Sequence, residues 1–200
     1  MSATVDRETL RQSHTKVQTS WWPPVEVMGM RSKVKKGAEK DAERVLRRSF
    51  RDSIAIEPVG IAERLGIQVS EVKLEPGTLG ALFMKPGADP EIVLNRRHSF
   101  LRRRVTCALE MGHYVHMSTE VDEYKRADLY DGSEEIGGAS NDEYAHEFAR
   151  SLLMPKEDVK VFADLWMDDL EMALRFRVPR EEMRIRLKSL GLRVPELGAA

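Results

Sequence analysis

The stretch from Ser99 to Met117 constrains the fold of this 200-residue chain more than any other. Its apolar residues recur at helical spacing and form one broad face, which predicts a buried helix. The carboxylate of Glu110 and the imidazole of His113 lie three residues apart within it, so both side chains share one face. Such a pair is typical either of hydrogen-bonded core residues or of a metal site.

The remaining pattern predicts an α+β fold with a small antiparallel sheet. Apolar residues at helical spacing predict further helices over residues 38–50, 58–65, 142–154, 157–176 and 180–190. Between residues 67 and 95, three short apolar segments are separated by Pro-Gly pairs, which is typical of strands joined by tight turns. We therefore expect the sheet to pack on the helices that carry the polar residues.

The chain is expected to form one folded unit behind an N-terminal tail. Residues 1–36 show no sustained period and predict a flexible tail, in which Trp21 and Trp22 are able to dock onto this domain or onto a partner. Residues 37–155 predict the main domain, and residues 156–200 a helical C-terminal extension of it. A basic run leads into the first helix and is able to contact phosphate, although solvated charge is the more common meaning of such a run. This run consists of Arg31, Lys33, Lys35 and Lys36.

The charge balance argues against a general binder of polyanions. The chain has 32 Lys and Arg against 33 Asp and Glu, a net charge of -1. Its single cysteine, Cys107, has no partner for an internal disulfide and is expected to pack in the core of a protein in a reducing compartment. No apolar run approaches the roughly 18 residues of a membrane span. Without an export signal, the expected location is the cytoplasm.

Leu109 and His113 are separated by the ligand spacing of the zinc-peptidase motif HExxH. In that motif two histidines hold the metal, and the glutamate beside the first histidine activates water. Here Leu109 takes the place of the first histidine, so the segment is an incomplete zinc motif. A second cluster follows in the helix predicted over residues 142–154, where Asp142 and His146 lie one turn apart. Zincins take a third ligand from such a later helix.

Together with these residues, several flanking motifs resemble the ImmA/IrrE family of metallopeptidases, which implies a zincin-like domain. The resemblance covers roughly residues 58–192. Its flanking motifs are Pro-x-x-Ile-Ala-x-x-Leu-Gly-Ile at 58–67, Ile-Val-Leu-Asn at 92–95, Arg-Arg-Val-Thr-Cys-Ala at 103–108 and Phe-Ala-Arg-Ser-Leu-Leu-Met-Pro at 148–155. Their order and spacing make the assignment specific.

The resemblance implies a zinc site with one ligand replaced. By position, Glu110 corresponds to the general base, His113 to a zinc ligand and Asp142 to the acidic third ligand. Because Leu109 cannot bind metal, a working site needs a substitute. His146 is the first candidate, which gives the set His113, Asp142 and His146. The fallback ligands are Glu143 and His116.

Three functions remain open. The resemblance implies a zinc endopeptidase that cleaves a regulatory protein, such as a phage or mobile-element repressor, with Tyr114 or Tyr144 as candidate oxyanion support. The alternative is a pseudoprotease that binds such a regulator without cutting it, since Leu109 is able to pack as a core residue. A third hypothesis is DNA contact through the C-terminal helices, which resemble a helix-turn-helix. Direct contact of this protein with nucleic acid is not expected, because acidic residues dilute the arginines of this region. Those arginines are Arg177, Arg180, Arg184 and Arg186.

The basic cluster before the buried helix has two interpretations. It is either a solvated face or a surface that holds an acidic segment of a partner. The cluster consists of Arg96, Arg97, Arg102, Arg103 and Arg104.

Overall fold

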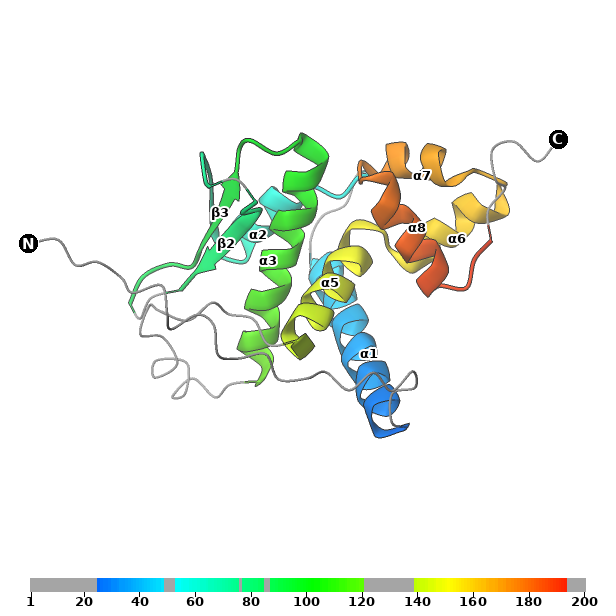
Figure 1. Cartoon of the computed structure of the whole chain (residues 1–200), viewed down its shortest axis with the longest axis horizontal. Helices are drawn as coiled ribbons and strands as arrows, with labels where there is room; N and C mark the ends of the chain where they lie inside the picture. The colour runs from blue at the N-terminus through cyan, green and yellow to red at the C-terminus, as the bar shows by residue number, and fades with distance from the viewer. Residues whose placement is uncertain (1–24, 49–52, 76, 85–86, 121–138, 194–200) are drawn as a thin grey trace, which may run out of the picture.

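The computed structural model describes residues 25–48, 53–75, 77–84, 87–120 and 139–193 (Figure 1). Within these ranges, side chains are described except for those of residues 25–32, 119–120 and 139–142. The predicted docking residues Trp21 and Trp22 lie outside the described part of the chain. The described elements form an α+β fold, as predicted from the sequence.

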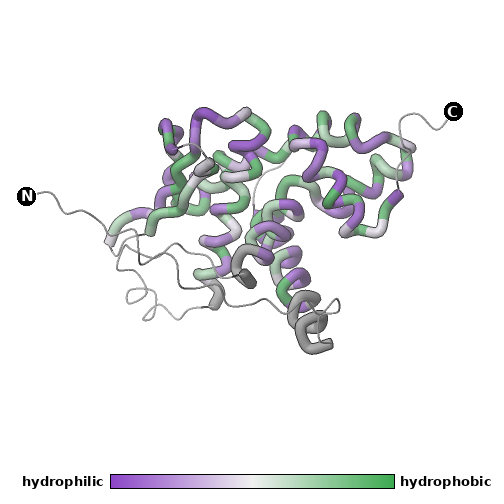
Figure 2. Tube along the Cα trace, viewed as in Figure 1, coloured by the Kyte–Doolittle hydropathy of each residue, from purple (hydrophilic) through white to green (hydrophobic). Residues whose placement is uncertain are grey.

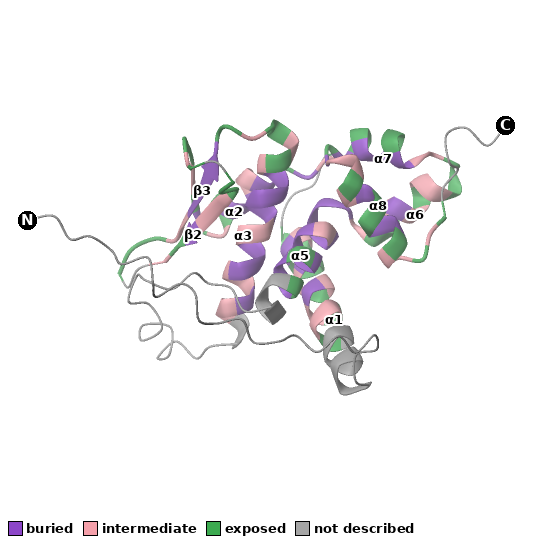
Figure 3. Ribbon diagram, in the orientation of Figure 1, coloured by how far each residue is buried: buried purple, intermediate pink, exposed green. Residues whose placement is uncertain are grey.

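Three long helices form the centre of the fold. They are α1 (Val25–Arg48), α3 (Phe100–Glu120) and α5 (Ala139–Leu153). Helix α5 lies between the other two and packs against both (Figure 1). Apolar side chains along these helices, among them Ala42, Met111 and Phe148, join one continuous core. Burial is concentrated along α3, α5 and the central strand of the sheet (Figure 3).

Helix α1 begins at Val25, earlier than the predicted start at residue 38, so residues 25–36 belong to the helix and not to a tail. Contacts made by Val34 and Lys35, which precede the predicted start, hold this longer helix against the rest of the protein. The side chain of Val34 packs against the core, and Lys35 lies 4.0 Å from a carboxylate oxygen of Glu147 on α5. Neither contact is visible in the periodicity of the segment itself, because both partners are distant in sequence.

The sheet is mixed, so the prediction of an antiparallel sheet is wrong for one of its two strand pairs. The strands are β1 (Gln68–Val72), β2 (Gly80–Phe83) and β3 (Glu91–Asn95), in the spatial order β1-β3-β2. Strand β2 pairs with β3 antiparallel, whereas β1 pairs with β3 parallel. Turn residues indicate that the chain reverses, but they do not decide which neighbour a strand selects. The most buried strand, β3, takes the central place.

The predicted short helix at residue 58 is present as α2 (Pro58–Arg64). Pro58 occupies its first turn, where the missing N–H costs nothing, and Gly66 follows its end with a φ of 78°. The buried guanidinium of Arg104 on α3 donates to the carbonyl of Ile56 and, at 2.9 Å, to the carboxylate of Glu57. Arg104 therefore holds the start of α2 against α3.

The C-terminal part contains α6 (Lys156–Asp164), α7 (Asp169–Phe176) and α8 (Arg180–Ser189). The single helix predicted over residues 157–176 is wrong, because Trp166 adopts a left-handed conformation with φ 59° and ends α6. A capping box then starts α7: Asp168 accepts from the N–H of Glu171 at 2.8 Å, and Glu171 accepts from the N–H of Asp168 at 3.1 Å.

Hydropathy follows the same organisation. Apolar and polar segments alternate along α3 and α5, as expected of helices with one buried face (Figure 2). Within the described ranges, no helix is both long enough and apolar enough to cross a bilayer.

Candidate functional site

Helices α3 and α5, which carry the predicted ligands, touch at Gly112. A methyl group built on Gly112 would lie 2.9 Å from the Cα atom of Ala145 and 3.1 Å from the ring of Phe148. The two backbones approach this closely because Gly112 has no side chain. Helices α3 and α5 therefore pack directly against each other.

The imidazole of His113 is buried, with 7% of the residue exposed, next to this close contact. Glu110 is half-buried one turn earlier on α3. Leu109 is also half-buried, and its side chain packs against the apolar core. The residue in the place of the first histidine thus contributes hydrophobic packing and offers no atom that binds a metal.

The candidate ligands on α5 are less favourably placed. His146 and Glu143 are exposed, whereas the neighbouring Ala145 makes the contact with α3. The side chain of Asp142 lies outside the described residues, so its predicted role stays a prediction. Among the side chains that the structure describes, no group of three His, Cys, Asp or Glu residues is placed to hold a metal ion.

The described donors therefore do not fit the zinc ion that the family resemblance implies. A catalytic zinc site keeps three protein ligands and one open position. Leu109 removes one ligand, and the candidate substitute His146 is exposed, whereas His113 is buried. We derive no catalytic step through zinc.

The fallback ligand His116 is buried against an aromatic residue of α5. Its ring stacks on the ring of Tyr144 on α5, with centroids 4.1 Å apart and planes 24° apart. The hydroxyl of Tyr144 donates a hydrogen bond of 2.7 Å to the carboxylate of Asp41 on α1. Tyr144 thus connects α1 to α3 through α5. Because its hydroxyl is engaged with Asp41, the geometry favours a structural role over the predicted support of an oxyanion.

Cys107, three residues before Glu110, is fully buried. Burial raises the pKa of its thiol to about 12, so the reactive thiolate is scarce at neutral pH. This environment agrees with the predicted packing role.

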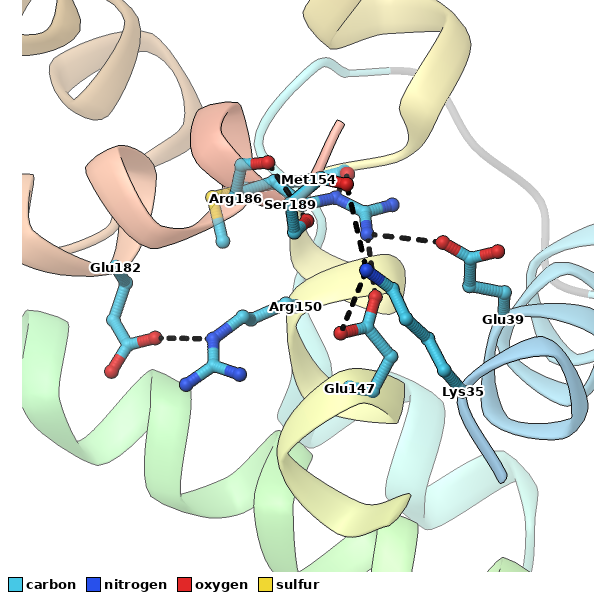
Figure 4. Close-up of polar contacts among 8 residues, drawn as sticks. All are labelled: Lys35, Glu39, Glu147, Arg150, Met154, Glu182, Arg186 and Ser189. Atoms are coloured by element: carbon cyan, nitrogen blue, oxygen red, sulfur yellow. Dashed lines mark hydrogen bonds and ion pairs between the residues drawn. The ribbon is translucent and has the colours of Figure 1, made fainter. Parts of the chain in front are cut away.

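A buried ion-pair network among α1, α5 and α8 was not predicted from the sequence (Figure 4). Arg186 on α8 is only 1% exposed, and its guanidinium donates to the carboxylate of Glu147 at 2.9 Å and to the carbonyl of Met154 at 3.1 Å. The same guanidinium lies 3.5 Å from a carboxylate oxygen of Glu39 on α1. The network therefore joins α1, α5 and α8, three elements that are far apart in sequence.

Burial dominates the electrostatics of this network. It lowers the pKa of Arg186 and raises the pKa of Glu147, although the opposite charges of the two residues act against both shifts. An outer pair continues the network: Arg150 on α5 donates to Glu182 on α8 at 3.0 Å. The local signals in the sequence are three opposite-charge pairs at helical spacing, and these do not reveal which helices meet. The pairs are Lys35 with Glu39, Glu147 with Arg150 and Glu182 with Arg186.

Most arginines of the hypothetical helix-turn-helix form ion pairs with carboxylates of this chain. Arg180 and Arg184 both donate to the buried carboxylate of Asp169 at the start of α7. Arg186 belongs to the buried network, so Arg177 alone of the four arginines is exposed without a described ion pair. This pairing disfavours DNA contact through α8.

Solved structures with this architecture include that of a transcriptional regulator. A Mycobacterium tuberculosis transcriptional regulator is similar with a TM-score of 0.53 and 19% sequence identity. The similarity covers 78% of this chain and 47% of that chain, so this chain spans about half the length of the regulator. At such low identity, the likeness shows the fold alone. No curated protein is significantly similar in sequence.

Comparison of the sequence with known protein families shows the family to which this chain belongs. Residues 62–188 match the Peptidase_M78 family, whose description is IrrE N-terminal-like domain. This range contains α3, α5 and most of the residues that carry the predicted ImmA/IrrE resemblance, which is thereby confirmed. Since the match covers more than half of the chain, this chain belongs to the family of IrrE N-terminal-like domains.

Proposed function

We propose that this chain binds a regulatory protein, such as a phage or mobile-element repressor, and does not cleave it by zinc chemistry. The observation that carries the proposal is the replacement of a metal ligand by Leu109, whose side chain packs against the core. Without a third ligand, zinc binding is weak, and Glu110 has no metal-activated water from which to take a proton.

The surrounding fold supports a role in binding. The α3–α5 contact at Gly112 and the buried His113 keep the framework of the family, although the ligand set is incomplete. The similar Mycobacterium tuberculosis protein is described as a transcriptional regulator, which agrees with a partner in the control of transcription. A cytoplasmic location belongs to the same proposal.

Metal analysis of the purified chain tests the loss of zinc chemistry. After incubation with zinc and removal of unbound metal, we expect the natural chain to retain little zinc. The variant Leu109→His restores the imidazole at the four-residue spacing from His113, so it should retain more zinc if Asp142 supplies the third ligand. Near-stoichiometric zinc in the natural chain, lost in His113→Ala, would instead support a working peptidase.

Photo-crosslinking tests the partner. A crosslinking amino acid in place of Tyr114, one residue from His113 on α3, should capture a transcriptional regulator in cells. We expect the captured regulator at its full length. Recovery of a cleaved regulator would contradict the proposal. Capture of no regulator, in cells that carry a phage or mobile element with its repressor, would also contradict it.

A further inference from the structure

We propose that the outward face of α1 binds the phosphate backbone of nucleic acid. This face is defined by the exposed residues between positions 33 and 48. These residues are Lys33, Lys36, Lys40, Glu43, Arg44, Arg47 and Arg48. Every exposed position on this part of the helix is charged, and Glu43 is its only acid.

The other acids of this part of α1 point inward. Glu39 lies 3.5 Å from the buried Arg186, and Asp41 accepts a hydrogen bond from Tyr144. Asp41 also pairs with Arg44 at 2.6 Å. The fold therefore engages these carboxylates with Arg186, Tyr144 and Arg44, and it leaves the other outward cations on the surface.

Four of the outward cations have no ion-pair partner among the described residues. Of the six cations on this face, Arg44 pairs with Asp41, and Arg47 lies 3.9 Å from Glu43. No described carboxylate pairs with the remaining four. These four are Lys33, Lys36, Lys40 and Arg48. No carboxylate of the described residues neutralises their charge, which is therefore available to a polyanion.

Charge is segregated between α1 and the rest of the chain. Helix α1 contains eight cationic and four acidic residues, a net charge of +4, whereas the whole chain has a net charge of -1. The remainder therefore has a net charge of -5. The balanced composition conceals one strongly basic element.

The cations are arranged along a line. Lys33, Lys36, Lys40, Arg44 and Arg47 follow one another at intervals of three or four residues, so they form one stripe parallel to the helix axis. At 1.5 Å per residue the stripe is about 21 Å long. Each strand of a duplex presents a phosphate about every 3.4 Å, so several phosphates fall within this length.

The composition of this face selects nucleic acid over other polyanions. A helix that binds a membrane surface inserts an apolar face, but the apolar residues of α1, such as Ala38 and Ala42, are buried in the core. A protein interface needs apolar or aromatic anchors at its centre. The outward face offers none between positions 33 and 48, whereas a phosphate backbone requires only cations.

This assignment differs from the sequence-based hypothesis of DNA contact in its location. The sequence offered DNA contact through the C-terminal helices as a hypothesis only, and there Arg180 and Arg184 are paired with Asp169. It also indicated that the basic run at the start of the first helix is able to contact phosphate, with solvated charge as the more common meaning. The inference concerns α1, on the other side of α5 from α3 (Figure 1). It is independent of the proposed function, because α1 carries none of the candidate metal ligands.

Fluorescence anisotropy of a labelled 20-base-pair duplex of arbitrary sequence, with the full chain as titrant, tests the inference. Four released counterions predict a slope of about -3.6 in a plot of log affinity against log salt concentration. The affinity should therefore fall roughly 100-fold between 50 and 200 mM salt. Failure of the natural chain to bind at 50 mM salt overturns the inference.

Two charge-matched variants separate the effect of α1 from that of net charge. In the first, Lys33, Lys36, Lys40 and Arg48 are all replaced by Gln, which preserves helix propensity. In the second, the same change is made at four exposed cations around the start of α3 that also have no described ion pair. These four are Lys73, Arg96, Arg97 and Arg102.

We expect the α1 variant to lose measurable binding and the control variant to keep the affinity and salt slope of the natural chain. Equal losses in both variants would overturn the inference, because they would reflect net charge alone. Poly-glutamate and vesicles of anionic phospholipid serve as competitors. If either binds through the α1 cations more tightly than the duplex does, the inferred ligand class is wrong.

Discussion

Replacement of the buried arginine is the sharpest test of how the helices are held together. In Arg186→Met, a side chain of similar length keeps most of the packing but removes the charge. Within the described part of the chain, the ion-pair partner that then remains for the carboxylate of Glu147, whose side chain is 8% exposed, is Lys35 at 4.0 Å. Breaking a buried ion pair in this way costs about 3 to 5 kcal/mol.

Two further contributions to the free energy of unfolding of this variant have opposite signs. The carbonyl of Met154 loses a hydrogen bond, which costs about 1 kcal/mol. Protonation of Glu147 relieves part of the penalty, because burial already raises the pKa of this carboxyl. We therefore expect Arg186→Met to lower the free energy of unfolding by about 3 to 4 kcal/mol at pH 7. Urea denaturation followed by circular dichroism measures this change.

A double variant distinguishes the charge effect from packing. In Arg186→Met with Glu147→Met, no buried charge of the pair remains, so the protein should regain at least about 2 kcal/mol relative to the single variant. The control Arg184→Met removes an arginine whose side chain is 61% exposed, and it should cost no more than about 1 kcal/mol. If the single and double variants prove equally unstable, the reasoning about the buried charge is refuted.

The pH dependence gives an independent check. A carboxyl with a raised pKa in the folded state contributes stability below its ordinary pKa, and this contribution is lost as the pH rises through the raised value. Loss of the Arg186 charge raises the pKa of Glu147 further. Arg186→Met should therefore recover stability, relative to the natural protein, as the pH is lowered from 7 to about 5. A constant difference across this range would contradict the assignment.

Two further predictions concern other contacts. Hydrogen bonds from two arginines, that from Arg180 first, lower the pKa of Asp169 to about 2, so its contribution is present above about pH 4 and is lost as the pH falls toward 2. Thermal melts of Asp169→Asn should show lower stability at pH 7 and a weaker acid dependence; unchanged melts contradict this. Gly112→Ala should cost about 1 to 3 kcal/mol because its methyl group meets Ala145, whereas Gly37→Ala, with space around its methyl group, should be neutral or stabilising.

The sequence determined the elements whose signals are local. Periodicity located α3 and α5, and Pro58 with Gly66 delimited α2, because helix formation depends on residues three or four positions apart. Motif order identified the family, and Leu109 in the ligand place is a fact of the sequence itself. The capping box formed by Asp168 and Glu171 is also a local signal, so the sequence contains enough information to predict the start of α7 and the break between α6 and α7.

Part of the candidate site was also predictable. That α3 and α5 lie together follows from the family motifs, and the structure places the buried His113 beside their contact. The exposure of His146 and the engagement of Tyr144 with Asp41 were not predictable. They depend on how far α5 is rotated between its two neighbours, and periodicity alone leaves that rotation open for residues at the edge of the buried face.

Only the tertiary structure decided which residues meet across long distances in the chain. The parallel pairing of β1 with β3 and the burial of Arg186 against Glu147 join segments that have no local signal in common. The same packing turns Glu39 and Asp41 inward and leaves the cations of α1 outside. A charge count along the sequence cannot separate paired from free charge, because pairing is a property of three-dimensional neighbours.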